Sequence, residues 1–71
     1  MKLYTVSKEV LQSLAASIER DAEASLTSYV LLGQTERYGD EMRRAATLRH
    51  AASQRSIYVR REILRASGFD L

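Results

Sequence analysis

Proline is absent from this chain, and glycine occurs only at positions 33, 39 and 68. Because these two residue types are the strongest interrupters of regular structure, a helix break must fall near a glycine or at a capping residue. The stretches between the glycines carry apolar side chains at the helical spacing of three and four residues. This pattern predicts an all-α fold.

The length of 71 residues allows one domain, residues 1–71. A domain of this size buries only about 60% of its unfolded surface, so its core is marginal. Cysteine is absent and histidine occurs once, which excludes disulfides and makes a structural metal site hard to build. We therefore expect no cofactor, and we expect stabilisation by self-association, as a homodimer or higher oligomer.

Membrane insertion is not indicated by the sequence. The longest apolar run, residues 29–32, is far shorter than the roughly 20 residues that a membrane span needs. The first residues lack the apolar stretch of a signal peptide. We therefore expect a cytoplasmic protein.

Residues 7–33 are expected to form one helix or a pair of helices. Ser7 is a good N-cap, and Val6 and Leu11 occupy the positions of a hydrophobic staple. Ser25 is a second capping residue, so the helix can break just before it. Residues 29–32 are apolar on every side, which favours a helix buried all round. One stripe at helical spacing joins Leu11, Leu14, Ala15, Ile18, Ala22, Leu26, Tyr29 and Gly33.

Residues 40–67 are expected to form one long arginine-rich helix, from about Glu41 to Ala66, with Asp40 as its N-cap. Gly68 fits the position after the helix end, where Phe69 could contact Leu64 as in a Schellman motif. At 100° per residue this helix has two apolar strips about 130° apart, which would need two packing partners. The main strip is Ala45, Leu48, Ala52, Ser56, Val59, Ile63 and Ala66, and the second is Ala46, Ser53, Ile57 and Leu64.

Residues 2–38 resemble ribbon-helix-helix DNA-binding proteins of the antitoxin and plasmid-mobilisation type. The resemblance lies in Leu3-Tyr4-Thr5-Val6, the cap Ser7, the spacing of Val10, Leu11, Leu14 and Ile18, and Ser25-Leu26-Thr27-Ser28-Tyr29-Val30-Leu31. It implies a homodimer in which the extended residues 1–6 pair as strands and enter the major groove. Lys2 and Thr5 would then face base edges, and the amides opening the helix at Ser25 and Thr27 would hold a phosphate. The alternative fold is an antiparallel two-helix hairpin that dimerises into a four-helix bundle.

Charge is divided between the two halves of the chain. Residues 1–42 hold 4 basic and 7 acidic side chains, a net charge of −3, whereas residues 43–71 hold 7 and 2, a net charge of +5. On the last helix, Arg43, His50, Arg61 and Arg65 would share one face. That face is either a solvated surface, an anion-binding surface in which Arg43, Arg61 and Arg65 contact DNA phosphates, or a contact for the acidic groups of the first half.

No catalytic pattern is present. His50 has no nucleophile and orienting partner beside it, and Glu19 and Glu23 lack the histidine that would complete a carboxylate metal site. We therefore expect a non-enzymatic, homodimeric DNA-binding regulator of the repressor or accessory type. The alternative is a helical protein-binding module that inhibits or adapts a larger host protein, with Val30, Leu31, Ile57 and Leu64 as its anchors.

Overall fold

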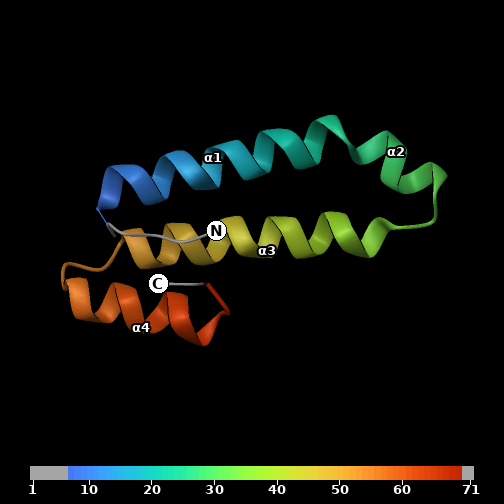
Figure 1. The fold of residues 1–71 in the computed structure, drawn as a ribbon. Coiled ribbons are helices and arrows are strands. Elements are labelled where there is room, and N and C mark those ends of the chain that lie inside the picture. The colour runs from blue at the N-terminus through green and yellow to red at the C-terminus, as the bar shows by residue number, and fades with distance from the viewer. Residues whose placement is uncertain (1–6, 70–71) are drawn as a thin grey trace.

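The computed structural model describes residues 7–69, which fold into four helices. These are α1 (Lys8–Ala24), α2 (Leu26–Leu31), α3 (Thr35–Ala52) and α4 (Ile57–Ala66). Figure 1 shows α1 and α3 side by side and antiparallel, with α4 along the other side of α3. The predicted all-α fold is confirmed, and the described residues contain an antiparallel helical pair, as in the hairpin alternative, with α4 added to it. The predicted ribbon, residues 1–6, lies outside the described residues.

The first helix begins where the sequence predicts. The Ser7 hydroxyl accepts a hydrogen bond from the Val10 amide at 3.3 Å and so satisfies one of the free donors of the first turn. The predicted stripe faces α3: Leu11, Ala15 and Ala22 are buried. Local capping and periodicity thus determine both the start and the buried face of α1.

The chain bends at Ser25 without reversing direction. The Ser25 amide donates to the Asp21 carbonyl at 3.1 Å, and its carbonyl accepts from the Tyr29 amide at 3.0 Å. Because helical hydrogen bonds run across the bend, α2 continues in the general direction of α1 (Figure 1). Of the two alternatives for residues 7–33, one helix or a pair, the structure contains a pair. The two helices follow one another as a single bent rod.

Gly33 reverses the chain after α2. It adopts a φ of +68°, in the left-handed region that side chains disfavour. The Gln34 amide donates to the Tyr29 carbonyl at 2.7 Å and the Gly33 amide to the Val30 carbonyl at 3.1 Å. This is the hydrogen-bond pattern of a Schellman motif, and it satisfies carbonyls that the end of α2 would leave free.

The predicted single helix over residues 40–67 is wrong. Helix α3 begins at Thr35, so Asp40 lies inside it and is no N-cap, and α3 ends at Ala52. The Ser53 hydroxyl donates to the His50 carbonyl at 2.6 Å, and the Ser56 hydroxyl accepts from the Val59 amide at 3.4 Å to begin α4. Serine competes with the helical backbone for hydrogen bonds, and the two serines on either side of this turn stop one helix and start the next.

The end of α4 agrees with the prediction. Gly68 has a φ of +90°, and the Phe69 amide donates to the Leu64 carbonyl at 3.0 Å, completing a Schellman motif. The Phe69 ring packs against the core, and the Arg44 guanidinium of α3 lies 5.4 Å from its centroid. These contacts fix the last described turn of the chain on α3.

The core is small and rich in alanine. Alanine on both α1 and α3 lets the two backbones approach closely, and leucines from α1, α3 and α4 fill the space beside them. The molecule is elongated, with principal extents of 41 × 20 × 18 Å. The buried core cluster consists of Leu11, Ala15, Ala45, Leu48, Ala51, Ala52 and Leu64.

Candidate interaction surfaces

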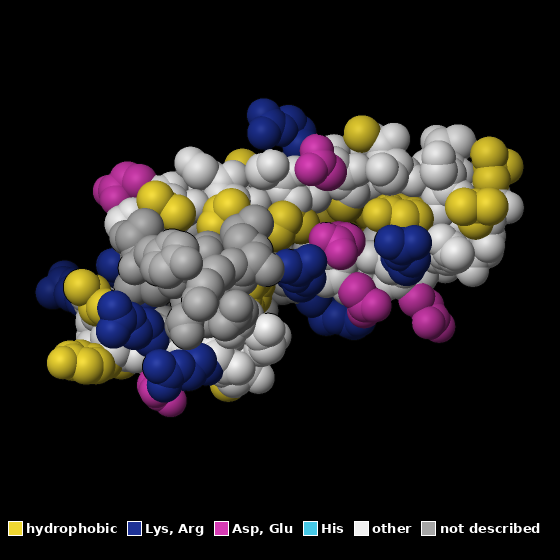
Figure 2. Space-filling model, in the orientation of Figure 1, with side chains coloured by type: hydrophobic (Ala, Val, Ile, Leu, Met, Phe, Trp, Pro, Cys, Tyr) yellow, Lys and Arg dark blue, Asp and Glu magenta, His cyan; other side chains and the backbone are white. Residues whose placement is uncertain are grey.

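Helix α2 presents an apolar surface to solvent at one end of the molecule. None of its residues is buried. Leu31 is 81% exposed and Leu32 69%, although the sequence favoured burial on all sides for this segment. We call the exposed residues the distal patch: Leu26, Val30, Leu31 and Leu32. Figure 2 shows yellow side chains at the α2 end of the molecule.

The distal patch is held in a defined position. Tyr29 is half-buried, and the Arg37 guanidinium of α3 lies 5.6 Å from the centroid of its ring. Together with the hydrogen bonds around Gly33, this stacking joins α2 to the first turn of α3. The exposed leucines therefore project from a held helix and need little ordering before they bind a partner.

A second apolar surface lies at the start of α4. Ile57 is 52% exposed and Tyr58 80%, and Val59 is exposed beside them. We call these three residues the α4 patch. The orientation of α4 is set by Leu64, which is fully buried, and by Arg60, whose Nε donates to the Gln54 carbonyl at 2.7 Å. This hydrogen bond closes the turn between α3 and α4.

Three of the four predicted protein-binding anchors are exposed, and one is not. Val30, Leu31 and Ile57 are accessible, but Leu64 is 0% exposed and belongs to the core. Its assignment as a surface anchor is therefore wrong. The helix break at residues 53–56 separates α4 from α3, and the buried side of α4 matches neither predicted strip. Leu64 of the second strip and Ile63 of the main strip pack inward, whereas Ile57 and Val59, one from each strip, are exposed.

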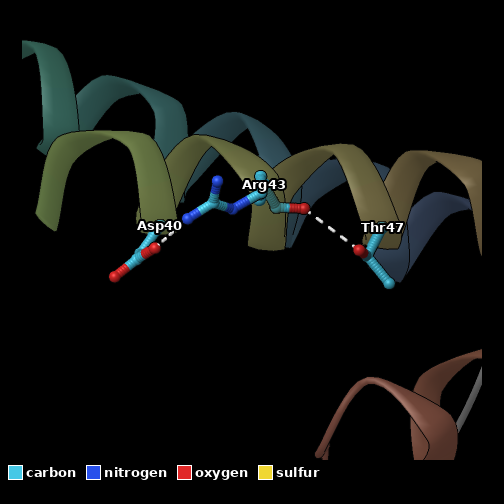
Figure 3. A network of polar contacts seen from close by, with 3 residues as sticks. All are labelled: Asp40, Arg43 and Thr47. Carbon is cyan, nitrogen blue, oxygen red and sulfur yellow. Dashed lines mark hydrogen bonds and ion pairs between the residues drawn. The ribbon is translucent and has the colours of Figure 1, made fainter. Parts of the chain in front are cut away.

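The predicted arginine face is divided between two helices. Arg43 lies on α3 and pairs with Asp40, while the Thr47 hydroxyl donates to the Arg43 carbonyl at 3.0 Å (Figure 3). Arg61 and Arg65 lie on α4, beyond the turn. All three arginines are exposed, but they do not share one face of a single helix.

The other predicted nucleic-acid contacts receive little support. Lys2 and Thr5 lie outside the described residues. The Ser25 amide already donates to the Asp21 carbonyl, so it cannot also hold a phosphate as predicted. Thr27 is exposed in α2, a helix of only six residues.

An ion pair bridges α1 and α3. The Arg49 guanidinium donates to both carboxylate oxygens of Glu19, at 2.5 and 3.3 Å. The hydrogen bond and positive charge of Arg49 lower the pKa of Glu19 below its ordinary value, and the same hydrogen bond raises the pKa of Arg49. One acidic group of the first half thus meets an arginine of the second within the same chain, through a residue that the predicted arginine face did not include.

Within residues 7–69 no three acidic or histidine side chains gather into a group that could hold a metal ion. His50 is exposed at the end of α3. None of the helices in this range has the length and apolar character that a membrane crossing requires. Comparison with protein-family models, with curated proteins and with solved structures gives no match.

Proposed function

We propose that this chain is a non-enzymatic protein-interaction module, of the kind that adapts or inhibits a larger protein, and that the distal patch is its binding surface. The observation that carries the proposal is the exposure of Leu31, the last residue of α2, and of its C-cap Leu32, at 81% and 69%, on a segment that adds no buried residue to the core. Contiguous apolar surface of this kind marks interaction sites on proteins.

The energetics favour a binding role for α2. Burying a leucine side chain contributes roughly 1.5–3 kcal/mol, and in the single chain Leu31 and Leu32 gain little of this. Burial against a partner would give these side chains the full stabilisation. Two or three well-buried apolar anchors are enough to dominate the affinity of a protein interface.

The charges around the distal patch indicate the chemistry of its partner. Asp21 and Glu23 lie in the last turn of α1, and Glu36 lies in the first turn of α3, on either side of α2. An apolar surface with a basic rim would complement both the leucines and these carboxylates. We therefore expect the partner surface to be apolar and basic.

The test is affinity capture with the tagged full chain. Leu31→Arg places a charge in the distal patch, whereas Gln12→Arg adds the same charge at an exposed position of α1 outside the patch. The retained partner is either a host protein or an untagged copy of this chain. The amount retained should decrease at least tenfold for Leu31→Arg, which is equivalent to a loss of about 1.4 kcal/mol in binding free energy. It should be unchanged for Gln12→Arg. Equal retention by all forms, or no retained protein at all, would contradict the proposal.

DNA binding by a homodimeric regulator is the second candidate function. It is favoured by the charge of +5 on residues 43–71 and by the exposure of Arg43, Arg61 and Arg65. Their carboxylate neighbours Asp40 and Glu62 are also exposed, so exchanging these ion pairs for phosphate contacts would sacrifice little. Such contacts would position the chain on a duplex without reading its sequence.

Duplex binding at several salt concentrations tests this second function. The logarithm of the binding constant should fall by about 0.9 per logarithmic unit of salt for each phosphate neutralised. The double variant Arg61→Ala plus Arg65→Ala should weaken binding to all duplexes about equally. Lys8→Ala plus Arg20→Ala removes the same charge from the first half and serves as the control. Binding that both double variants leave unchanged would remove α4 from any DNA interface.

A further inference from the structure

The distal patch and the α4 patch lie at opposite ends of the molecule. Figure 1 places α2 at one end of the elongated fold and the start of α4 at the other, and the longest extent is 41 Å. A single chain therefore cannot cover one patch with the other. Within residues 7–69, neither patch is buried by another part of the chain.

The two ends have opposite charge. Residues 20–42, which include α2 and the adjoining turns of α1 and α3, hold 5 acidic and 2 basic side chains, a net charge of −3. Residues 53–69, which include α4, hold 4 basic and 1 acidic, a net charge of +3. In Figure 2 side chains of both signs are visible at each end: magenta and dark blue lie near the yellow group at the α2 end, and dark blue with some magenta lies beside the yellow group at the α4 end, so the charge difference is one of balance.

We infer that copies of this chain bind one another head to tail, with the distal patch of one copy on the α4 patch of the next. This inference rests on the proposed function, because it names the partner of the distal patch. That partner was expected to be apolar and basic, and the α4 patch is both: Ile57 and Tyr58 are exposed, and Arg55 and Arg61 precede and follow them on the surface.

The contact joins two different surfaces, so it leaves a free patch at each end of a pair. Such a heterologous contact adds further copies until the assembly closes into a ring or grows as a filament. With a few apolar anchors on each side, the interface is at the small end of the range for specific contacts, below about 1,200 Å² in total. Association should therefore be weak, dependent on concentration and reduced by salt, which screens the opposed charges.

Sedimentation of the full chain and two variants tests the arrangement. Leu31→Arg disables the distal patch and brings a cation toward the basic end, whereas Tyr58→Glu disables the α4 patch and brings an anion toward the acidic end. Both side chains are at least 80% exposed, and circular dichroism verifies that each variant keeps its helix content. Gln12→Arg is the charge control.

Wild type and Gln12→Arg should form species larger than a dimer as their concentration rises. Each of the two patch variants alone should remain monomeric, because every contact needs both patches. A mixture of the two should form dimers and nothing larger, because the intact distal patch of one binds the intact α4 patch of the other.

Three outcomes would overturn the inference. If wild type stays monomeric at high concentration, copies do not associate, while capture of a different protein through Leu31 would still support the proposed function. If Tyr58→Glu still dimerises and Leu31→Arg does not, distal patches pair with each other. If the mixed variants fail to form a dimer, the two patches are not partners.

Discussion

The α1–α3 pair and helix α2 are built from similar aliphatic residues but use them differently. Leu11 and Leu48 are buried between helices that run side by side, whereas Leu31 and Leu32 extend beyond that contact into solvent. The difference comes from neighbours, since the alanine-lined surfaces of α1 and α3 cover each other and α2 has no helix on its outer side (Figure 1). Apolar content alone does not separate a core from a binding surface.

Truncating one leucine in each region should produce the largest contrast. Leu48→Ala leaves a cavity in the core and should lower the free energy of unfolding by about 2–5 kcal/mol. That is a large part of the roughly 5–15 kcal/mol that stabilises a typical domain. Leu31→Ala should change it by less than about 0.5 kcal/mol, because the side chain is already in water. Urea unfolding measures both, and a large loss for Leu31→Ala would mean that α2 belongs to the core.

The glycines on either side of the start of α3 should respond in opposite directions. Gly33→Ala forces a side chain into a positive φ and should destabilise the chain by about 1–2 kcal/mol. Gly39→Ala lies inside α3, where an added Cβ meets nothing within 4 Å, and should stabilise it by roughly 0.5–1 kcal/mol. Thermal unfolding of the two variants compares them directly. Equal effects on the two variants would contradict the positive φ at Gly33, because a side chain would then carry no conformational penalty there.

The ion pair on the edge of the α1–α3 contact should give the smallest effect, and one that depends on pH. Because Arg49 lowers the pKa of Glu19 below 4.5, the pair stabilises the fold above that pH, and this stability is lost as the pH falls through the lowered pKa. Glu19→Gln should therefore reduce the melting temperature slightly at pH 7. At pH 2 the variant and wild type should melt together, and a difference that persists there would not come from the carboxylate.

The sequence predicted those features that depend on local interactions. The Ser7 cap, the buried stripe of α1 and the Schellman motif at Gly68 each follow from residues within a few positions of one another. The antiparallel pairing of α1 and α3 matches one of the two predicted alternatives. In each case one physical requirement, such as a capping acceptor or a positive φ, is met by a residue type that few others can replace.

The break at residues 53–56 could not be seen in the apolar periodicity. Ala52, Val59 and Ile63 keep helical spacing straight through it, and no glycine or proline interrupts the segment. The available signal was the serine on each side, Ser53 and Ser56, followed by a run of residues with modest helix propensity. A helix that continues through this break places Leu64 on the surface and puts Arg43 on the same face as the arginines of α4. Gly39 has the opposite effect on the prediction. It suggests a helix start at Asp40, but α3 begins at Thr35 and contains Gly39 in its interior.

The short connections between the helices also bear on how quickly the chain folds. Only residues 32–34 separate α2 from α3, and residues 53–56 separate α3 from α4, so α3 meets α2 and α4 by closing small loops, whereas the α1–α3 contact spans α2 and joins residues as distant in sequence as Glu19 and Arg49. Loop closure over such distances carries little entropic penalty. Helical chains dominated by local contacts fold in microseconds to milliseconds, which leaves the exposed leucines of α2 on an already ordered scaffold soon after synthesis.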